Sequence, residues 1–106
     1  MSRSRDVDRT PDGRYLVIDG RRWRAADPEL PDDLRASLQS ALGRARSAVR
    51  TADDAARPGA RRRVQLAKEG LGERGDPWWE LARAERVSRA RQRLAAIVEL
   101  EESAGR

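Results

Sequence analysis

The side chains that could carry out catalysis are few in this chain. Histidine and cysteine are both absent, so the commonest general base, the thiol nucleophiles and the usual nitrogen and sulfur ligands of metals are missing. Tyr15, Lys68, hydroxyls and carboxylates remain. The adjacent carboxylates of Asp32-Asp33 and of Asp53-Asp54 diverge on a helix, which disfavours shared acid–base or metal chemistry. We therefore expect no enzyme, no metal site and no cofactor.

Phosphate binding is a second chemistry that the sequence could support. Residues 57–75 hold six basic and two acidic residues, within a chain whose formal net charge is +5. Every basic residue except Lys68 is arginine, whose forked guanidinium suits phosphate or carboxylate. Three further arginines share one arc of the expected last helix. The candidate nucleic-acid contacts are Arg57, Arg61, Arg62, Arg63, Lys68, Arg74, Arg86, Arg89 and Arg93.

A solvated charged surface is the alternative interpretation of this basic segment. Glu69, Glu73 and Glu85 interrupt the positive charge. No helix-turn-helix, zinc finger or aromatic ribonucleoprotein motif accompanies it. Both interpretations stay open on the sequence.

Tryptophans supply a third kind of candidate, because they can complete a small core or anchor an interface. We expect Trp23 in the core. Trp78 and Trp79 are adjacent on an expected helix and point about 100° apart, so at most one of them can be central to the same core. The other one is a candidate partner contact.

The expected last helix, residues 77–101, carries an apolar stripe longer than a small core requires. This stripe favours packing against another protein or against a second copy of the chain. The candidate partner contacts are Trp78, Trp79, Leu81, Val87, Leu94 and Val98.

A tight β-hairpin at residues 15–24 must position the first part of the chain. Asp19-Gly20 supplies the positive φ angles of a two-residue turn and pairs Tyr15 with Arg24 across the strands. One face would carry Leu16, Ile18 and Trp23, and we expect helices to cover it. The other face should be more exposed, with cation–π contacts among Tyr15, Arg22 and Arg24.

Three amphipathic helices should follow the hairpin. Apolar residues at three- and four-residue steps predict a helix from Pro31 to about Ala56, and Pro58-Gly59 should separate it from a helix that begins at Ala60. Pro77 should begin the third helix. The expected fold class is α+β, mostly helical, with a two-stranded antiparallel hairpin packed on an antiparallel helical hairpin plus a C-terminal helix.

We expect one domain with loose ends. Residues 1–9 should form a disordered tail, residues 10–100 the β-hairpin and three-helix domain, and residues 101–106 a frayed end. No run of about 20 apolar residues and no apolar leader is present. The expected location is therefore cytoplasmic, without membrane insertion.

Two sequence blocks resemble a family of small uncharacterised bacterial proteins, some of them labelled "biopolymer transporter Tol". The first block reads TPDGRY and continues into DGRRWR and Asp27-Pro28; the second reads LGERG, Asp76 and then PWW. The likeness covers residues 9–80. It implies no catalytic residues, and the lack of a spanning segment argues against transport in the literal sense.

Taken together, these features predict a non-catalytic protein-interaction or assembly module. The alternative is a nucleic-acid-binding accessory protein that uses residues 57–74.

Overall fold

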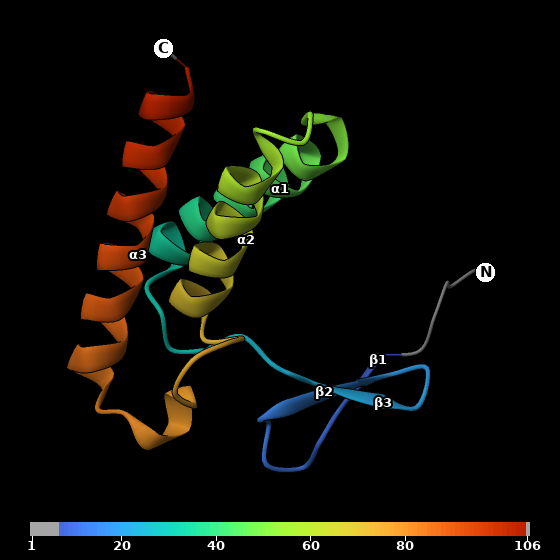
Figure 1. Ribbon diagram of the computed structural model, residues 1–106. Helices are drawn as coiled ribbons and strands as arrows, with labels where there is room; N and C mark the ends of the chain where they lie inside the picture. The colour runs from blue at the N-terminus through green and yellow to red at the C-terminus, as the bar shows by residue number, and fades with distance from the viewer. Residues whose placement is uncertain (1–6, 106) are drawn as a thin grey trace.

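Three short strands precede three α-helices in the computed structural model, which describes residues 7–105 (Figure 1). The strands are β1 (Val7–Arg9), β2 (Tyr15–Ile18) and β3 (Arg21–Arg24). The helices are α1 (Asp32–Thr51), α2 (Arg57–Leu71) and α3 (Arg83–Ala104), with a short 3-10 helix, η1 (Trp78–Glu80), before α3. The α+β, mostly helical fold class is confirmed.

The hairpin of β2 and β3 has the predicted register. Tyr15 pairs with Arg24 and Ile18 with Arg21 on either side of the turn. Asp19 and Gly20 have φ angles of 52° and 80°, the positive values that a two-residue turn requires. The local sequence therefore determines this element.

Val7–Arg9 is a third strand, so the prediction of a disordered tail over residues 1–9 is wrong for its last part. β1 pairs antiparallel with β2, and Asp8 lies opposite Val17. The connection is tight, because the Thr10 N–H donates to the Tyr15 carbonyl (2.9 Å) and the Tyr15 N–H donates to the Thr10 hydroxyl (3.1 Å). The turn at residues 10–13 thus joins two strands. Residues 1–6 of the expected tail lie outside the described residues.

The helix boundaries differ from the expected ones near prolines and caps. α1 ends at Thr51 instead of Ala56, and α2 begins at Arg57 because Pro58 fits the first turn of a helix. α3 begins at Arg83 instead of Pro77, where the Glu85 carboxylate accepts the Ala82 N–H (3.0 Å). α3 continues to Ala104, into the segment expected to fray.

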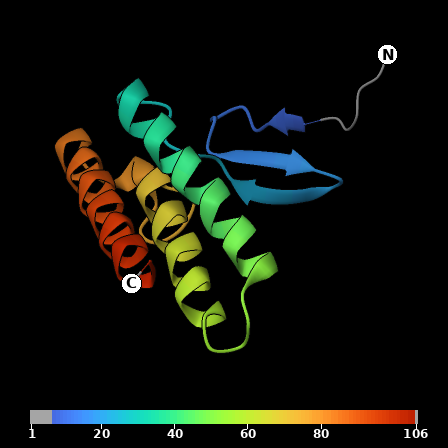
Figure 2. The same cartoon turned by 90° about the horizontal axis from the view of Figure 1, so that it is seen from above.

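The core lies among the three helices, and Figure 2 shows α2 between α1 and α3. Leu38, Leu71 and Ile97 are its largest fully buried side chains. At Gly70 a methyl group would lie 2.9 Å from Leu38, so the bare backbone lets α1 and α2 approach closely. Within residues 7–105, no helix has the length and apolar character needed to cross a bilayer.

The sheet lies at one end of the helical body (Figure 1), and it contacts the connection between α2 and α3. The Tyr15 ring meets the Trp79 ring edge-on, with centroids 5.5 Å apart, and the Arg24 guanidinium donates to the Gly75 carbonyl (2.6 Å). The sheet does not cover the helical hairpin as predicted, because this contact uses the face that was expected to be outermost. Trp23 lies on the opposite face.

The prediction that Trp23 belongs to the core is therefore wrong. Its side chain is 48% exposed, and the Arg21 guanidinium lies 4.9 Å from the ring centroid. The predicted cation–π contact of Arg22 with Tyr15 is present at 4.2 Å, whereas Arg24 lies over Trp79.

A substitution at Gly72 tests how tightly the end of α2 packs against Trp78. Gly72 ends α2 with φ at 91°, and an added Cβ would lie 2.9 Å from Trp78 Cδ1. Gly72→Ala should lower the free energy of unfolding by roughly 2 to 4 kcal/mol through backbone strain and steric overlap, as measured by urea denaturation. Gly59→Ala is the matched control, because a Cβ there meets nothing within 4 Å. Equal stability of the two variants would contradict this account.

Candidate functional site

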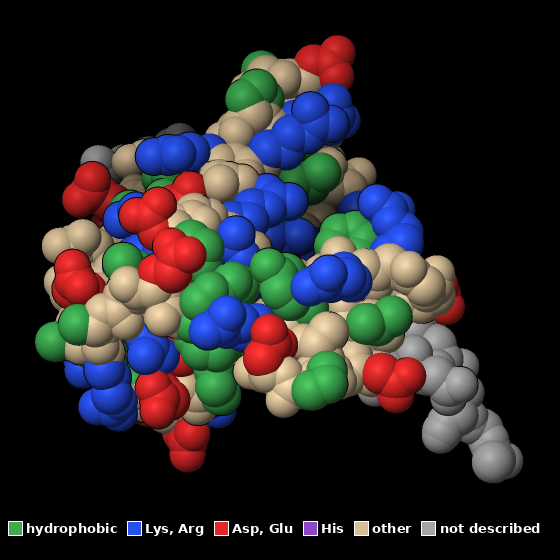
Figure 3. Space-filling view, turned by 90° about the horizontal axis from the view of Figure 1, so that it is seen from below, with side chains coloured by type: hydrophobic (Ala, Val, Ile, Leu, Met, Phe, Trp, Pro, Cys, Tyr) green, Lys and Arg blue, Asp and Glu red, His purple; other side chains and the backbone are tan. Residues whose placement is uncertain are grey.

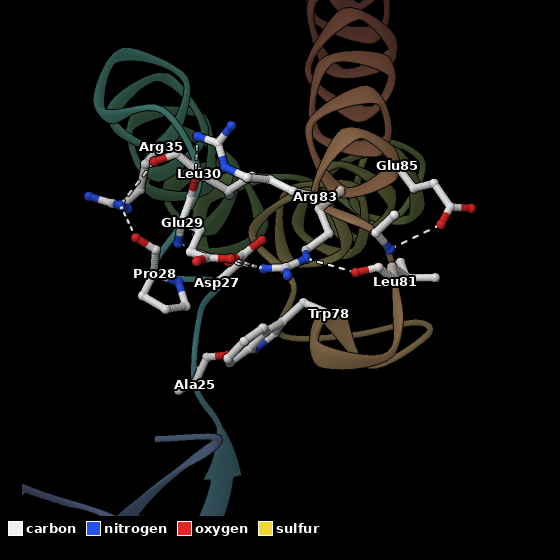
Figure 4. A network of polar contacts seen from close by, with 12 residues as sticks. Ala25, Asp27, Pro28, Glu29, Leu30, Arg35, Trp78, Leu81, Arg83 and Glu85 are labelled. Atoms are coloured by element: carbon white, nitrogen blue, oxygen red, sulfur yellow. Dashed lines mark hydrogen bonds and ion pairs between the residues drawn. The ribbon is translucent and has the colours of Figure 1, made fainter. Parts of the chain in front are cut away.

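A buried carboxylate holds together the end of the molecule where the sheet joins the helices. Asp27 is 2% exposed, and its Oδ1 accepts from Arg86 Nη1 (3.0 Å) and from the Glu29 N–H (2.9 Å). The same Arg86 nitrogen also donates to Glu29 Oε1, and Arg86 Nε donates to the Leu81 carbonyl. Figure 4 shows Asp27, Glu29 and Leu81 close together, with the hydrogen bonds and ion pairs of this network as dashed lines. These groups satisfy one another, so the arrangement serves structure.

The two adjacent tryptophans have different environments. Trp78 is 8% exposed, and its indole N–H donates to the Ala25 carbonyl (2.9 Å). Trp79 is half-buried between Trp78 and Tyr15, with the Arg14 guanidinium 4.9 Å from its ring centroid. Trp78 is thus the core tryptophan, and Trp79 is the contact between the helical body and the sheet.

Of the other candidate partner contacts, three are half-buried and only Val98 is exposed. Leu81 is half-buried, and Val87 and Leu94 pack against the core at its margin. Val98 is 41% exposed. The structure therefore brings Leu94 and Val98 together on one open surface and separates the tryptophans from them.

This open surface is the acidic edge of α3, defined here by Ala95, Val98, Glu99 and Glu102. All four side chains are exposed. They border a shallow groove that also contains Leu34 of α1 and, from α3, Leu94 and the exposed Arg91. The groove exists because α1 and α3 touch over a smaller area than either shares with α2. It offers apolar contact beside two carboxylates and one guanidinium, with an excess of one negative charge.

A second hollow, the basic groove, lies between α1 and α2 and has a volume of 560 Å³. Figure 3 shows Lys and Arg side chains gathered around a hollowed part of the molecular surface, next to hydrophobic side chains. Val49 and Val64 are half-buried and supply the apolar part. The polar residues that line the basic groove are Arg46, Arg50, Arg61, Gln65 and Arg74.

The positive charges of Arg46 and Arg74, which line this groove, act on the nearby Lys68 and Glu73, whose own opposite charges favour each other. Burial lowers the pKa of Lys68, and the positive charges of Arg74 and Arg46 lower it further. Burial raises the pKa of Glu73, although Lys68, Arg46 and Arg74 all favour its charged form. A ligand that brings negative charge would relieve the repulsion among these cations.

The structure divides the candidate nucleic-acid contacts into separate groups. Arg86, Arg89 and Arg93 are committed to the body of the protein, since Arg89 donates to the Asp76 carbonyl and Arg93 to Glu69. Arg57 forms an ion pair with Asp54 at the start of α2. Among the described residues, Arg62 and Arg63 form no ion pair. Only Arg61 and Arg74 of the candidate set line the basic groove.

Arg46 and Arg50 are site residues that the sequence analysis did not include. Their spacing of four places them on one side of α1, and Val49 lies between them. That spacing beside an apolar residue is the signal that could have identified one wall of the groove.

Among residues 7–105, no group of three or more carboxylates lies close enough to hold a metal ion. Comparison with family models, curated proteins and solved structures finds no match to this chain. The resemblance to the bacterial family therefore stays a prediction.

Arg86 allows a test of the buried ion pair. Arg86→Met should lower the free energy of unfolding by about 3 kcal/mol, because it leaves the Asp27 carboxylate buried without a cation. Adding Asp27→Asn to this variant should recover part of the loss, since no buried charge then remains. Arg83→Met is the control, because exposed Arg83 makes one 3.3 Å hydrogen bond to the Glu29 carbonyl. Urea denaturation measures the free energy of unfolding of all three variants. Equal losses for Arg83→Met and Arg86→Met would contradict the assignment of Arg86 as the partner of buried Asp27.

Proposed function

We propose that this chain is a non-catalytic protein-interaction or assembly module that binds through the acidic edge of α3. The observation that carries the proposal is the exposure of Val98, at 41%, next to a groove that contains Leu34 and Leu94. An exposed apolar side chain beside an apolar groove favours burial against a partner.

The form of α3 supports the same proposal. Ile97 is fully buried and fixes the helix against the core, so its neighbour Val98 is presented on a rigid surface. Glu99 and Glu102 lie beside Val98 on the same edge, and their negative charges would favour a partner with basic residues. A rigid helix edge with an apolar centre and a charged margin is typical of helix-mediated recognition.

Photo-crosslinking at position 98 tests this function in living cells. A photoreactive amino acid in place of Val98 should give a covalent adduct with a protein, because the edge is occupied there. The same amino acid in place of Glu80, an exposed residue of η1, is the matched control and should give none. Mass spectrometry of the adduct distinguishes a second copy from a different protein. Absence of an adduct at position 98, or an equal yield at position 80, would refute the proposal.

Nucleic-acid binding is a second candidate function, favoured by the four arginines that converge on the basic groove. If four phosphates are bound, a fourfold rise in salt should weaken binding roughly 50- to 150-fold. Fluorescence anisotropy with a labelled oligonucleotide of about 20 residues measures this. Arg46→Glu with Arg50→Glu should abolish binding, whereas Arg62→Glu, outside the groove, should weaken it much less. Lack of binding at low salt would exclude this function.

A further inference from the structure

The chain carries two surfaces of opposite excess charge, each with apolar residues beside the charges. The acidic edge of α3 combines Ala95 and Val98 with two exposed carboxylates. The basic groove combines Val49 and Val64 with four arginines. We propose that the acidic edge of one copy docks into the basic groove of a second copy. This inference rests on the proposed function, because it identifies the partner of the same edge.

The spacing of the charges fits on both sides. Arg46 and Arg50 are four residues apart on α1, which separates them by about 6 Å along the helix axis. Glu99 and Glu102 are three residues apart on α3, a separation of about 4.5 Å. Each carboxylate can therefore meet one guanidinium, and arginine binds carboxylate with two parallel hydrogen bonds.

The apolar parts fit as well. Ala95 and Val98 are small, so a helix that presents them can approach the half-buried Val49 and Val64 at the bottom of the groove. The C-terminal end of α3 also carries the negative end of the helix dipole, which adds to the attraction. An acidic helix edge thus satisfies both the apolar and the charged parts of the groove.

A phosphate backbone fits this groove less well. It would leave Val49 and Val64 without an apolar contact. The arginines that could extend the positive track along α3 are used elsewhere, since Arg93 pairs with Glu69 and Arg86 with Asp27. The observations therefore favour a protein ligand over nucleic acid, and nucleic-acid binding becomes an outcome of the test.

The acidic edge cannot dock into the basic groove of its own copy. The basic groove and the groove beside the acidic edge share no lining residue, and buried Ile97 holds α3 in place. Glu101 is also paired with Arg44 of α1 at 2.8 Å. Each copy then offers one edge and one groove on different surfaces, so two copies can exchange both contacts in a two-fold dimer, or one contact per pair can repeat head-to-tail in rings or open chains.

Two complementary double variants test this contact by sedimentation. The wild-type chain should associate as its concentration rises. Arg46→Glu with Arg50→Glu reverses the two groove charges that would face the edge, and Glu99→Arg with Glu102→Arg reverses both carboxylates of the edge. Each double variant alone should associate on the order of 100-fold more weakly, because like charges then face each other. An equimolar mixture of the two should associate again, since each altered surface meets its complement in the other variant.

Arg21→Glu with Arg62→Glu is the charge-matched control, because both arginines are exposed and neither lines the groove. It should associate like the wild type, and melting temperatures should confirm that every variant is folded. A monomeric wild-type chain, or a mixture that stays monomeric, would overturn the inference. A monomeric chain that binds an oligonucleotide through Arg46 and Arg50 would assign the groove to nucleic acid instead. A crosslink from position 98 to a different protein would preserve the proposed function while the self-docking inference fails.

Discussion

The buried carboxylate of Asp27 needs a positively charged partner, because an unpaired charge in the interior would lower the free energy of unfolding by several kcal/mol. Its pairing with Arg86 connects the segment after β3 to the first turn of α3, and its own N–H donates to the Leu71 carbonyl at the end of α2 (2.8 Å). One residue therefore connects three parts of the chain that are distant in sequence. The buried Trp78 indole closes the same junction through the Ala25 carbonyl. Both proposed interaction surfaces depend on helices that this junction holds in place.

Arginine has two distinct uses in this protein. Arg86 and Arg93 cover or enter the body of the protein and bind carboxylates within it. Arg46 and Arg50 project beside a hollow between two helices. The net charge of the chain cannot separate these uses, since both contribute equally to it. What separates them is whether an acceptor of the same chain lies within reach.

Patterns that depend on neighbours in sequence were predictable. The Asp19-Gly20 turn fixed the strand register, and the apolar spacing of Leu34, Leu38 and Leu42 identified the buried face of α1. Features that depend on contacts between residues distant in sequence were not predictable. β1 has no apolar alternation of its own and forms by pairing with β2, whereas the exposure of Trp23 follows from the contact of Tyr15 with Trp79.

The candidate site follows the same division. The helical conformation of α3 could be predicted from its sequence, but its buried face could not, because Ala90 and Ile97 are its buried residues and Val98 of the expected stripe is 41% exposed. The basic groove could not be predicted, because it combines arginines from α1, α2 and the segment after α2.

The narrow attachment of the sheet, through Trp79 and the Arg24 contact to Gly75, has a consequence for unfolding. We expect strand amides to exchange with solvent through local opening while the helical body stays closed, so the chain behaves as two cooperative units of unequal stability.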